Sequence, residues 1–296
     1  IFWPRRFGYI FAAFITIVIL AQDDGDRVLA RARSFFGCYE VVASEQRTLR
    51  YLNHGNIVHG GQCVSSILRD VPILYYHPSG PTGQVLQQYN RQRNVRVGIV
   101  GMGAGMVAAY SRFSHEYVFF EIDPVVIRIA RDPHLFTYLA DARGKIRVVC
   151  GDGRLGLAAE PEHSFDVLMF DAYSSDAIPV HLLTREAMQL FLSRLKPGGI
   201  MLFHLSNRYL RLEPVLGNLC EDLELTAVIQ DHEPDEKKLP PSEVGLVSSS
   251  RWALVASESA NLVKWLPDPR WKLLSGDPRV GVWTDQFSSI LSVFRK

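Results

Sequence analysis

The sequence predicts an α/β protein built around a mostly parallel sheet with helices on both faces. Five short, wholly apolar strand candidates follow residue 96, and helix-length segments separate most of them. Apolar strands that alternate with helices are typical of a parallel sheet buried on both faces. Two later strand candidates have only a polar stretch between them, so we expect them to pair antiparallel.

Length and composition limit the class of protein. A chain of 296 residues indicates two domains, or one large domain with an appendage. Hydrophobic residues make up 47% of it, which excludes disordered and collagen-like proteins. With 32 basic and 31 acidic side chains the net charge is +1, which argues against nucleic-acid binding through overall positive charge. The four scattered cysteines predict no disulfide framework and favour a reducing compartment.

The N-terminal segment is unusually apolar. Residues 7–21 carry no charge and follow Arg5 and Arg6. As a helix this run would span about 22 Å, less than the ~30 Å hydrocarbon core of a bilayer. A membrane helix, a signal peptide cleaved near Ala21 and a core or interface helix all fit. We favour membrane attachment of a fragment of a larger membrane protein, with the catalytic domain cytoplasmic because arginines cluster within residues 27–33.

A β-rich stretch follows this segment. Its strand-like runs FFGCYEVVA, TLRYLNHG and NIVHGGQ are separated by short turns such as Asn-His-Gly. From Arg96 onward the pattern changes to alternating strands and helices. We therefore predict a hydrophobic helix and linker over 1–32, a small β-hairpin domain over 33–93 and a Rossmann-like catalytic domain over 94–296.

The predicted catalytic domain has a recognisable strand plan. Its apolar strand candidates are RVGIVG, YVFFEID, IRVVCGD, FDVLMFDA and GIMLFHLSN, with helices expected over 105–113, 124–139 and 183–195. LTAVIQ and RWALVAS supply the antiparallel pair. Five parallel strands and a closing antiparallel hairpin are the layout of class I methyltransferase-like domains with a seven-stranded sheet.

A glycine loop follows the first of these strands. Gly101, Gly103 and Gly105 allow a tight turn and close approach of the backbone to a ligand at a helix N-terminus. The spacing is G-x-G-x-G rather than the dinucleotide fingerprint G-x-G-x-x-G, which favours a sulfonium nucleoside over NAD. A purely structural glycine turn is the alternative.

Acidic residues follow the next two strands. Glu121 ends the second strand, where a carboxylate can accept both hydroxyls of a ribose. Asp152 and Gly153 follow the third strand, and Asp152 is placed to accept a hydrogen bond from an adenine amino group. The alternatives are an exposed acid at a strand end and a turn aspartate that stabilises its own loop.

The fourth strand leads into the segment DAYSSDAIP, which has two acids five residues apart. Asp171 and Asp176 on one loop indicate a site that handles a cation. An amine with a pKa near 10 must lose a proton before it attacks, and a carboxylate can orient the ammonium and accept or relay that proton. Asp176 could instead cap the helix expected near Pro179.

Several motifs occur in one order along the chain: HGNIVHGGQ, YYHP, GMGAG, FFEIDP, GDGR, DAYSSDAIPVHLLTREA and LKPGG. This series resembles the spermidine synthase family of polyamine aminopropyltransferases, and is most similar to the branch fused behind bacterial membrane helices. The resemblance covers residues 33–207 well and the rest loosely. Its most specific part is DAYSSDAIP, and its least specific part is the glycine loop.

The resemblance implies roles for individual residues. Gln62 matches a glutamine near the nucleoside, and Tyr76 and His77 match a pair that lines the amine pocket. Glu121 matches the ribose-binding acid and Asp152 the adenine-contacting aspartate.

The same resemblance makes Asp171 the catalytic aspartate and implies catalytic roles for Asp176 and Tyr76. It also places Asp176, Tyr173 and His77 in the diamine site. Two positions depart from the family pattern. Ala104 replaces an aspartate that binds the aminopropyl amine of the donor, and Pro78 replaces an acid after the tyrosine–histidine pair. Both changes weaken the case for the standard donor and for putrescine.

The predicted function is therefore aminopropyl transfer from decarboxylated S-adenosylmethionine to a polyamine, with release of methylthioadenosine. The donor is a co-substrate, and we expect no tightly bound cofactor and no metal. A methyltransferase that uses S-adenosylmethionine and a non-catalytic polyamine or nucleoside sensor are the alternatives. The expected partner is a small polyamine, with a homodimer as the candidate assembly.

Overall fold

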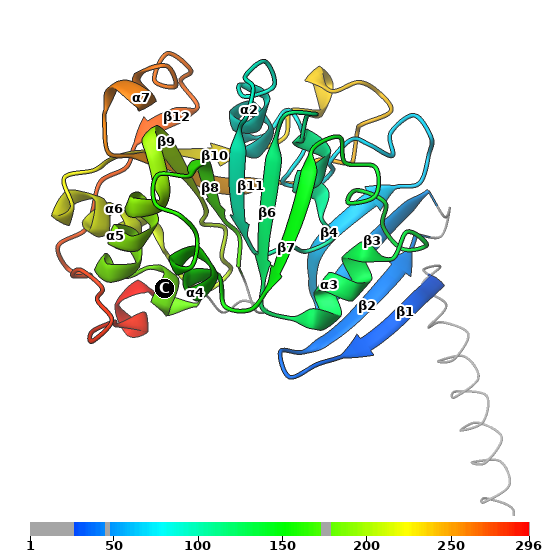
Figure 1. Ribbon diagram of the computed structural model, residues 1–296, viewed down its shortest axis with the longest axis horizontal. Coiled ribbons are helices and arrows are strands. Elements are labelled where there is room, and N and C mark those ends of the chain that lie inside the picture. Colours follow the sequence, from blue (N-terminus) through cyan, green and yellow to red (C-terminus); the bar gives the residue numbers. More distant parts are fainter. Residues whose placement is uncertain (1–26, 45–47, 173–178, 296) are drawn as a thin grey trace, which may run out of the picture.

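A computed structural model describes residues 27–44, 48–172 and 179–295, which form two sheets (Figure 1). The apolar run 7–21, Tyr173 and Asp176 lie outside these residues. Among the described residues, no helix combines the length and the apolar character needed to cross a bilayer.

The first sheet is antiparallel and has the strand order β1-β2-β3-β4. Its strands are β1 (Arg27–Arg33), β2 (Cys38–Ala43), β3 (Leu49–His54) and β4 (Ile57–Cys63). It begins earlier than the boundary predicted at residue 33, because the arginine-rich stretch pairs along β2 as an edge strand. Arg31 Nε lies 2.7 Å from Glu40 Oε1 across that pair. Charged side chains are common on edge strands because they discourage further pairing.

The second sheet confirms the predicted fold class. Its order is β12-β10-β11-β9-β8-β5-β6-β7. The strands are β5 (Arg96–Val100), β6 (Glu116–Glu121), β7 (Lys145–Cys150), β8 (Phe165–Phe170), β9 (Leu195–His204), β10 (Thr226–His232), β11 (Ser250–Ala256) and β12 (Trp271–Leu273). β5 to β9 pair in parallel, and β9, β11, β10 and β12 pair antiparallel in that order. The sheet has one strand more than predicted, since the three-residue β12 is too short to give a sequence signal.

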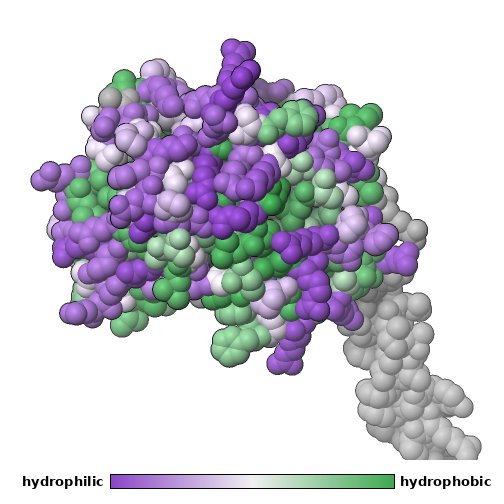
Figure 2. Space-filling model, in the orientation of Figure 1, coloured by the Kyte–Doolittle hydropathy of each residue, from purple (hydrophilic) through white to green (hydrophobic). Residues whose placement is uncertain are grey.

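Helices cover both faces of this sheet, as the apolar strands require (Figure 1). The helices are α2 (Pro81–Gln87), α3 (Pro124–Arg131), α4 (Gly153–Ala158), α5 (Arg185–Arg194), α6 (Glu213–Asp222) and α7 (Ala260–Val263), with 3-10 turns η1 (Met106–Tyr110), η2 (Val180–Leu182), η3 (Glu236–Lys238) and η4 (Ile290–Val293). Alternate residues of β5 enter different cores: Val97 and Ile99 pack with α2 and α3, and Val100 packs with α5 and α6. Outside these cores, hydrophilic side chains cover most of the face shown in Figure 2, with apolar ones between them.

Two predicted helices are shorter than expected. The helix expected over 124–139 starts at Pro124, where the Asp123 carboxylate accepts the Val125 N–H at 2.8 Å, but it ends at Arg131. Asp132 precedes a proline, and a residue before proline is disfavoured in the helical region. The helix expected over 105–113 is only the 3-10 turn η1, because the chain must reach the start of β6 at Glu116.

The small sheet packs against the loops that follow β5 and β6. Arg50 Nη1 donates to the carbonyl of Leu135 at 3.0 Å, and the Ser34 hydroxyl donates to the Asp123 carboxylate. Figure 1 shows β1 to β4 beside α3 and the β6–β7 edge. The four-stranded sheet therefore borders the carboxyl ends of the parallel strands, where the predicted site lies.

Candidate functional site

The glycine loop joins three strands at this edge. Gly101 has φ +94°, and a Cβ there would lie 2.1 Å from the carbonyl oxygen of Asp171. Gly103 has φ +51°, and a Cβ there would lie 2.3 Å from the carbonyl oxygen of His59 on β4. Only glycine suits both the left-handed conformation and the close backbone approach. The loop therefore has a structural role, and it also brings the small sheet over the ends of the parallel strands.

Glu121 is buried beside this loop. Its Oε2 accepts the Met102 N–H at 3.0 Å and its Oε1 accepts the Asp123 N–H at 2.9 Å. Burial raises the pKa of Glu121, and these backbone hydrogen bonds oppose the increase. Each carboxylate oxygen has a second lone pair, so the group can still accept hydroxyl donors from a ligand.

Asp152 has the structural role of a helix cap. Its Oδ1 accepts the Leu155 N–H at 2.9 Å at the start of α4, and its Oδ2 lies 2.8 Å from Nε2 of His181. Gly153 follows, and a Cβ there would lie 2.4 Å from Cγ1 of Val100. The turn interpretation of Asp152 therefore holds, and it is compatible with a ligand contact because Asp152 also faces a cavity.

This cavity, the glycine-loop cavity, has a volume of about 360 Å³. Small-molecule sites commonly occupy about 300–1,000 Å³. Its walls include many of the residues predicted from sequence, namely Gly101, Gly103, Glu121, Asp152, Gly153 and Asp171. Phe36, Tyr39, Phe120 and Val126 add apolar surface. Carboxylates from three strand ends and an apolar wall suit a nucleoside with a polar ribose and a flat base.

Asp171 is fixed by two hydrogen bonds. Asp171 directly follows β8. Its Oδ2 accepts a hydrogen bond from the Tyr76 hydroxyl, and its Oδ1 lies 2.6 Å from Nδ1 of His204. Burial alone would raise the pKa of Asp171, but the nearby His204 and the two hydrogen bonds hold that pKa below its ordinary value. The carboxylate is therefore kept ionised in a buried position.

His204 is the main site residue that sequence reasoning missed. It is the last residue of β9, and its ring stacks between Tyr75 and Trp252, with centroid distances of 4.7 and 4.5 Å. Its Nε2 lies 2.8 Å from Oγ of Ser206. The signal was present in the strand GIMLFHLSN, since a polar residue at the carboxyl end of a parallel strand belongs to the same edge as Asp171.

The hydrogen bonds around His204 allow it to carry a proton. An ionised Asp171 only accepts, so Nδ1 carries hydrogen and, in the neutral ring, Nε2 accepts from Ser206. The Ser206 oxygen also accepts the Arg251 N–H at 2.8 Å. If Nε2 gains a proton, the Ser206 hydroxyl can turn and accept from it without loss of the Arg251 hydrogen bond.

A second cavity of about 660 Å³ is also lined by Asp171. We call it the charged cavity, because its walls carry the side chains of Asp171, His204, Arg208, Asp231, Glu233, Arg251 and Arg295. Asp171 and His59 line both cavities. A ligand in either cavity can therefore contact Asp171, and the two ligands can meet there.

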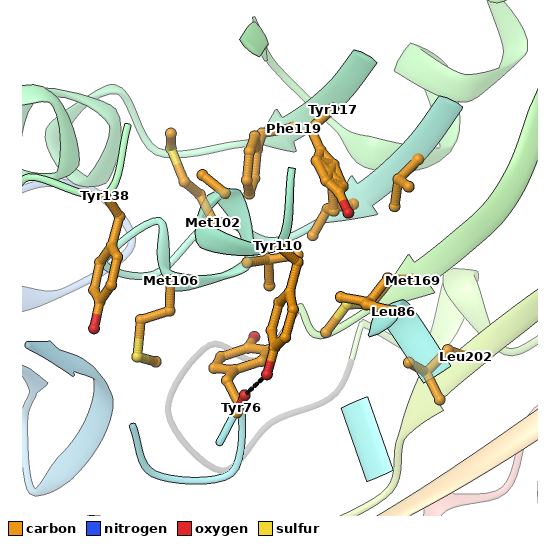
Figure 3. Close-up of a cluster of buried hydrophobic side chains, with 14 of the residues drawn as sticks. Tyr76, Leu86, Met102, Met106, Tyr110, Tyr117, Phe119, Tyr138, Met169 and Leu202 are labelled. Carbon is orange, nitrogen blue, oxygen red and sulfur yellow. Dashed lines mark hydrogen bonds between the residues drawn. The ribbon is translucent and has the colours of Figure 1, made fainter. Parts of the chain in front are cut away.

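Tyr76 and His77 come from the segment before α2. Tyr76 is buried, and the Tyr110 hydroxyl donates to the Tyr76 carbonyl at 2.5 Å (Figure 3). Burial and the nearby Asp171 carboxylate raise the pKa of Tyr76. His77 lies 3.1 Å from Oε2 of Glu243 and 2.9 Å from Oγ of Ser79. Neither residue lines the glycine-loop cavity or the charged cavity described above, and Tyr76 contacts the site through its hydrogen bond to Asp171.

Gln62 does not reach the glycine-loop cavity. Its Nε2 donates to the Thr137 hydroxyl at 2.8 Å and to the Arg69 carbonyl at 3.1 Å, and its Oε1 accepts the Thr137 N–H at 2.9 Å. These contacts tie β4 to the chain after α3. Gly105 is also outside the cavity walls and has φ +78° before η1.

The two departures from the family pattern have structural consequences. Ala104 is fully buried. A Cβ added to Gly60 would lie 2.7 Å from the Cβ of Ala104, so there is no free space around position 104. Pro78 supplies no acid, but Glu243 from the loop before β11 reaches His77 instead.

Among the described residues, no cluster of three or more His, Cys, Asp or Glu side chains is placed to hold a metal ion.

Comparisons with known proteins agree with the motifs. No family model matches the chain. A polyamine aminopropyltransferase from Vibrio vulnificus is 31% identical over 113 residues, which are 36% of this chain and 36% of that protein. The match thus spans about a third of the length of this curated relative.

Solved structures show the fold. A probable spermidine synthase from Corynebacterium glutamicum matches with a TM-score of 0.62 at 16% identity, over 89% of this chain and 98% of that one. A spermidine synthase in complex with the transition state analogue AdoDATO matches with a TM-score of 0.50 at 15% identity, over 78% and 73%. The resemblance to the spermidine synthase family is thereby confirmed.

Proposed function

We propose that this chain transfers an aminopropyl group from decarboxylated S-adenosylmethionine to an amine and releases methylthioadenosine. The observation that carries the proposal is the position of Asp171, which lines both cavities and is hydrogen-bonded to Tyr76 and His204. A transfer between two substrates needs such a meeting point. The names of the relatives support the same reaction class.

The donor would occupy the glycine-loop cavity. Glu121 would accept the ribose hydroxyls, Asp152 would face the base, and the sulfonium would point toward Asp171. All three carboxylates line this cavity. A positively charged sulfonium is favoured near an ionised carboxylate that water does not screen.

The acceptor amine would approach from the charged cavity. Its nitrogen lone pair forms a bond to the methylene carbon beside sulfur while the carbon–sulfur bond breaks, and that electron pair returns to sulfur to give the neutral thioether. The proton lost from nitrogen passes to the Asp171–His204 pair. An aspartate with a lowered pKa is a weak base, so Asp171 mainly orients the amine and His204 holds the proton.

Asp171→Asn tests the proposal. Asn keeps the size of the side chain but cannot accept from both Tyr76 and His204 with two oxygens. We expect the release of methylthioadenosine in the presence of a decarboxylated donor and an amine panel to fall at least 100-fold. Binding of methylthioadenosine, followed by its thermal shift, should persist.

The controls separate the alternatives. Glu162→Gln changes an exposed acid that lines neither cavity and should leave the rate unchanged. Absence of turnover in the wild type with every amine tested would contradict the transferase and support a sensor. Ala104 provides no acid for a donor amine, which keeps methyl transfer as the second candidate. Stronger stabilisation by S-adenosylhomocysteine than by methylthioadenosine would favour that reaction.

A further inference from the structure

The charged cavity contains more positive charge than a site for a simple polyamine requires. Three guanidinium groups line it, those of Arg208, Arg251 and Arg295. A diamine or triamine is cationic along its length, and like charges facing it cost binding free energy. The cavity also holds acids, so its wall offers both signs of charge to one ligand.

Ion pairs within the protein account for only part of this positive charge. Arg251 pairs with Asp231 and with Glu213, and Arg295 Nη2 is 4.0 Å from the same Glu213 carboxylate. Burial and the neighbouring Arg295 lower the pKa of Arg251, as expected where cations are crowded. One carboxylate of α6 thus faces two guanidinium groups.

Arg208 stands apart from this network. It follows β9 four residues after His204, lines the cavity and has no hydrogen bond or ion pair to any residue that the structure describes. A guanidinium presents paired N–H donors that match the two oxygens of a carboxylate. Arg208 is exposed, so it can take such a partner from an entering ligand without breaking a contact.

Ser250 adds a buried donor in the same wall. It is 7% exposed, and its Oγ has no hydrogen-bond partner among the described residues. Buried hydroxyl groups are normally hydrogen-bonded, so an unpaired hydroxyl in a residue of the cavity wall is a donor that a polar ligand group can satisfy. Ser250 begins β11 next to Arg251, which places a hydroxyl donor beside the guanidinium groups.

We propose that the acceptor is an amine that also carries a carboxylate, as a diamino acid does, with its ammonium at Asp171 and its carboxylate at Arg208 and Ser250. This inference rests on the proposed function and names the acceptor class for the same site. Glu233, which also lines the cavity, is available to the second ammonium of a diamino acid. Bond formation and proton release follow the displacement described above, because the carboxylate takes no part in it.

Ornithine and putrescine are matched probes, since they share the diamine chain and differ by one carboxylate. With the decarboxylated donor, we expect kcat/KM for ornithine to exceed that for putrescine at least tenfold. Arg208→Gln should lower the ornithine value about 10–100-fold. The putrescine value should not fall, because the variant removes a cation that faces this diamine. Arg208→Lys should recover part of the loss. Arg279→Gln changes an exposed arginine outside both cavities and is the control.

A binding measurement keeps the inference testable without turnover. In the presence of methylthioadenosine, ornithine should raise the Tm more than putrescine, and Arg208→Gln should abolish the difference. Equal or better use and binding of putrescine would overturn the inference while transfer itself confirmed the proposed function. No transfer to either amine would contradict the proposed function, and the binding result would still decide the ligand class. If Arg208→Gln weakened only S-adenosylmethionine binding, the carboxylate would be the donor's and the inference would fail.

Discussion

His204 Nδ1 lies 2.6 Å from Asp171 Oδ1, and the two side chains are 8% and 7% exposed. They come from the ends of neighbouring parallel strands, so the sheet itself sets their spacing. Tyr75 and Trp252 hold the imidazole ring from both faces. A carboxylate and an imidazole fixed in this way form one unit that can orient a cation and take up a proton.

Replacing His204 by Gln should separate these two roles. Gln can donate an N–H to Asp171 but cannot be protonated at neutral pH. We expect the transfer rate to fall about 100-fold or more, because the variant lacks the imidazole that takes up the proton of the amine. A KM for the donor close to that of the wild type would show that the glycine-loop cavity is intact.

Ser206→Ala is the matched control for His204. It removes the hydroxyl from Nε2 but keeps the imidazole and its contact with Asp171. A smaller loss of rate than in His204→Gln is expected. An unchanged rate in His204→Gln would show that the histidine only fills space between two aromatic rings.

The Asp171 carboxylate should also make stability depend on pH. Its pKa is lower in the folded protein than the ordinary value of about 3.9. A lowered pKa gives stability that is present above the unfolded-state pKa and is lost as the pH falls through the folded-state pKa. We would measure the free energy of unfolding in urea between pH 6 and pH 3. The difference in this free energy between wild type and Asp171→Asn should become smaller below about pH 4. A difference that does not depend on pH would contradict a stabilised carboxylate.

The sequence predicted the main sheet because β5 to β9 are apolar and therefore buried on both faces. It also predicted the cavity walls at Glu121, Asp152 and Asp171, since polar residues that follow parallel strands gather at one edge. Gln62 and His77 could not be placed this way, because their partners Thr137 and Glu243 are distant along the chain.

Other features depend on packing that a sequence pattern does not contain. The arginines of β1 lie along an edge strand of the first sheet, and their charge pattern in the sequence did not indicate this pairing. Arg208 and Ser250 reach one cavity only because β9 and β11 are neighbours in the sheet. His204 was not predicted as a site residue, because its segment was identified as a strand from its hydrophobic residues. Its position at the carboxyl end of β9 nevertheless indicated that it lies at the same edge as Asp171.

Gly103→Ala tests the contact between the glycine loop and β4. A Cβ at this position would lie 2.3 Å from the His59 carbonyl oxygen, and the φ of +51° is itself unfavourable for alanine. Gly245→Ala is a matched control, with φ +79° and no atom within 4 Å. The control should lose about 1–2 kcal/mol of stability from its backbone conformation. Gly103→Ala should lose a further ~1–3 kcal/mol from overpacking and should weaken methylthioadenosine binding. Equal losses in both variants would show that β4 moves away freely.

The loop before β11 is held by a contact between partly buried Glu243 and buried His77, and it should open when that contact is removed. Glu243 Oε2 lies 3.1 Å from His77 Nε2, and the Leu74 N–H donates to the Leu246 carbonyl at 2.5 Å. Burial lowers the pKa of His77 and Glu243 opposes that shift. Glu243→Ala should therefore lower the pKa of His77 further, measured by NMR, and speed tryptic cleavage after the exposed Lys238 several-fold. Glu236→Ala lies in the same loop without the histidine contact and should cleave at the wild-type rate. Equal cleavage of both variants would mean that the backbone bonds alone hold the loop.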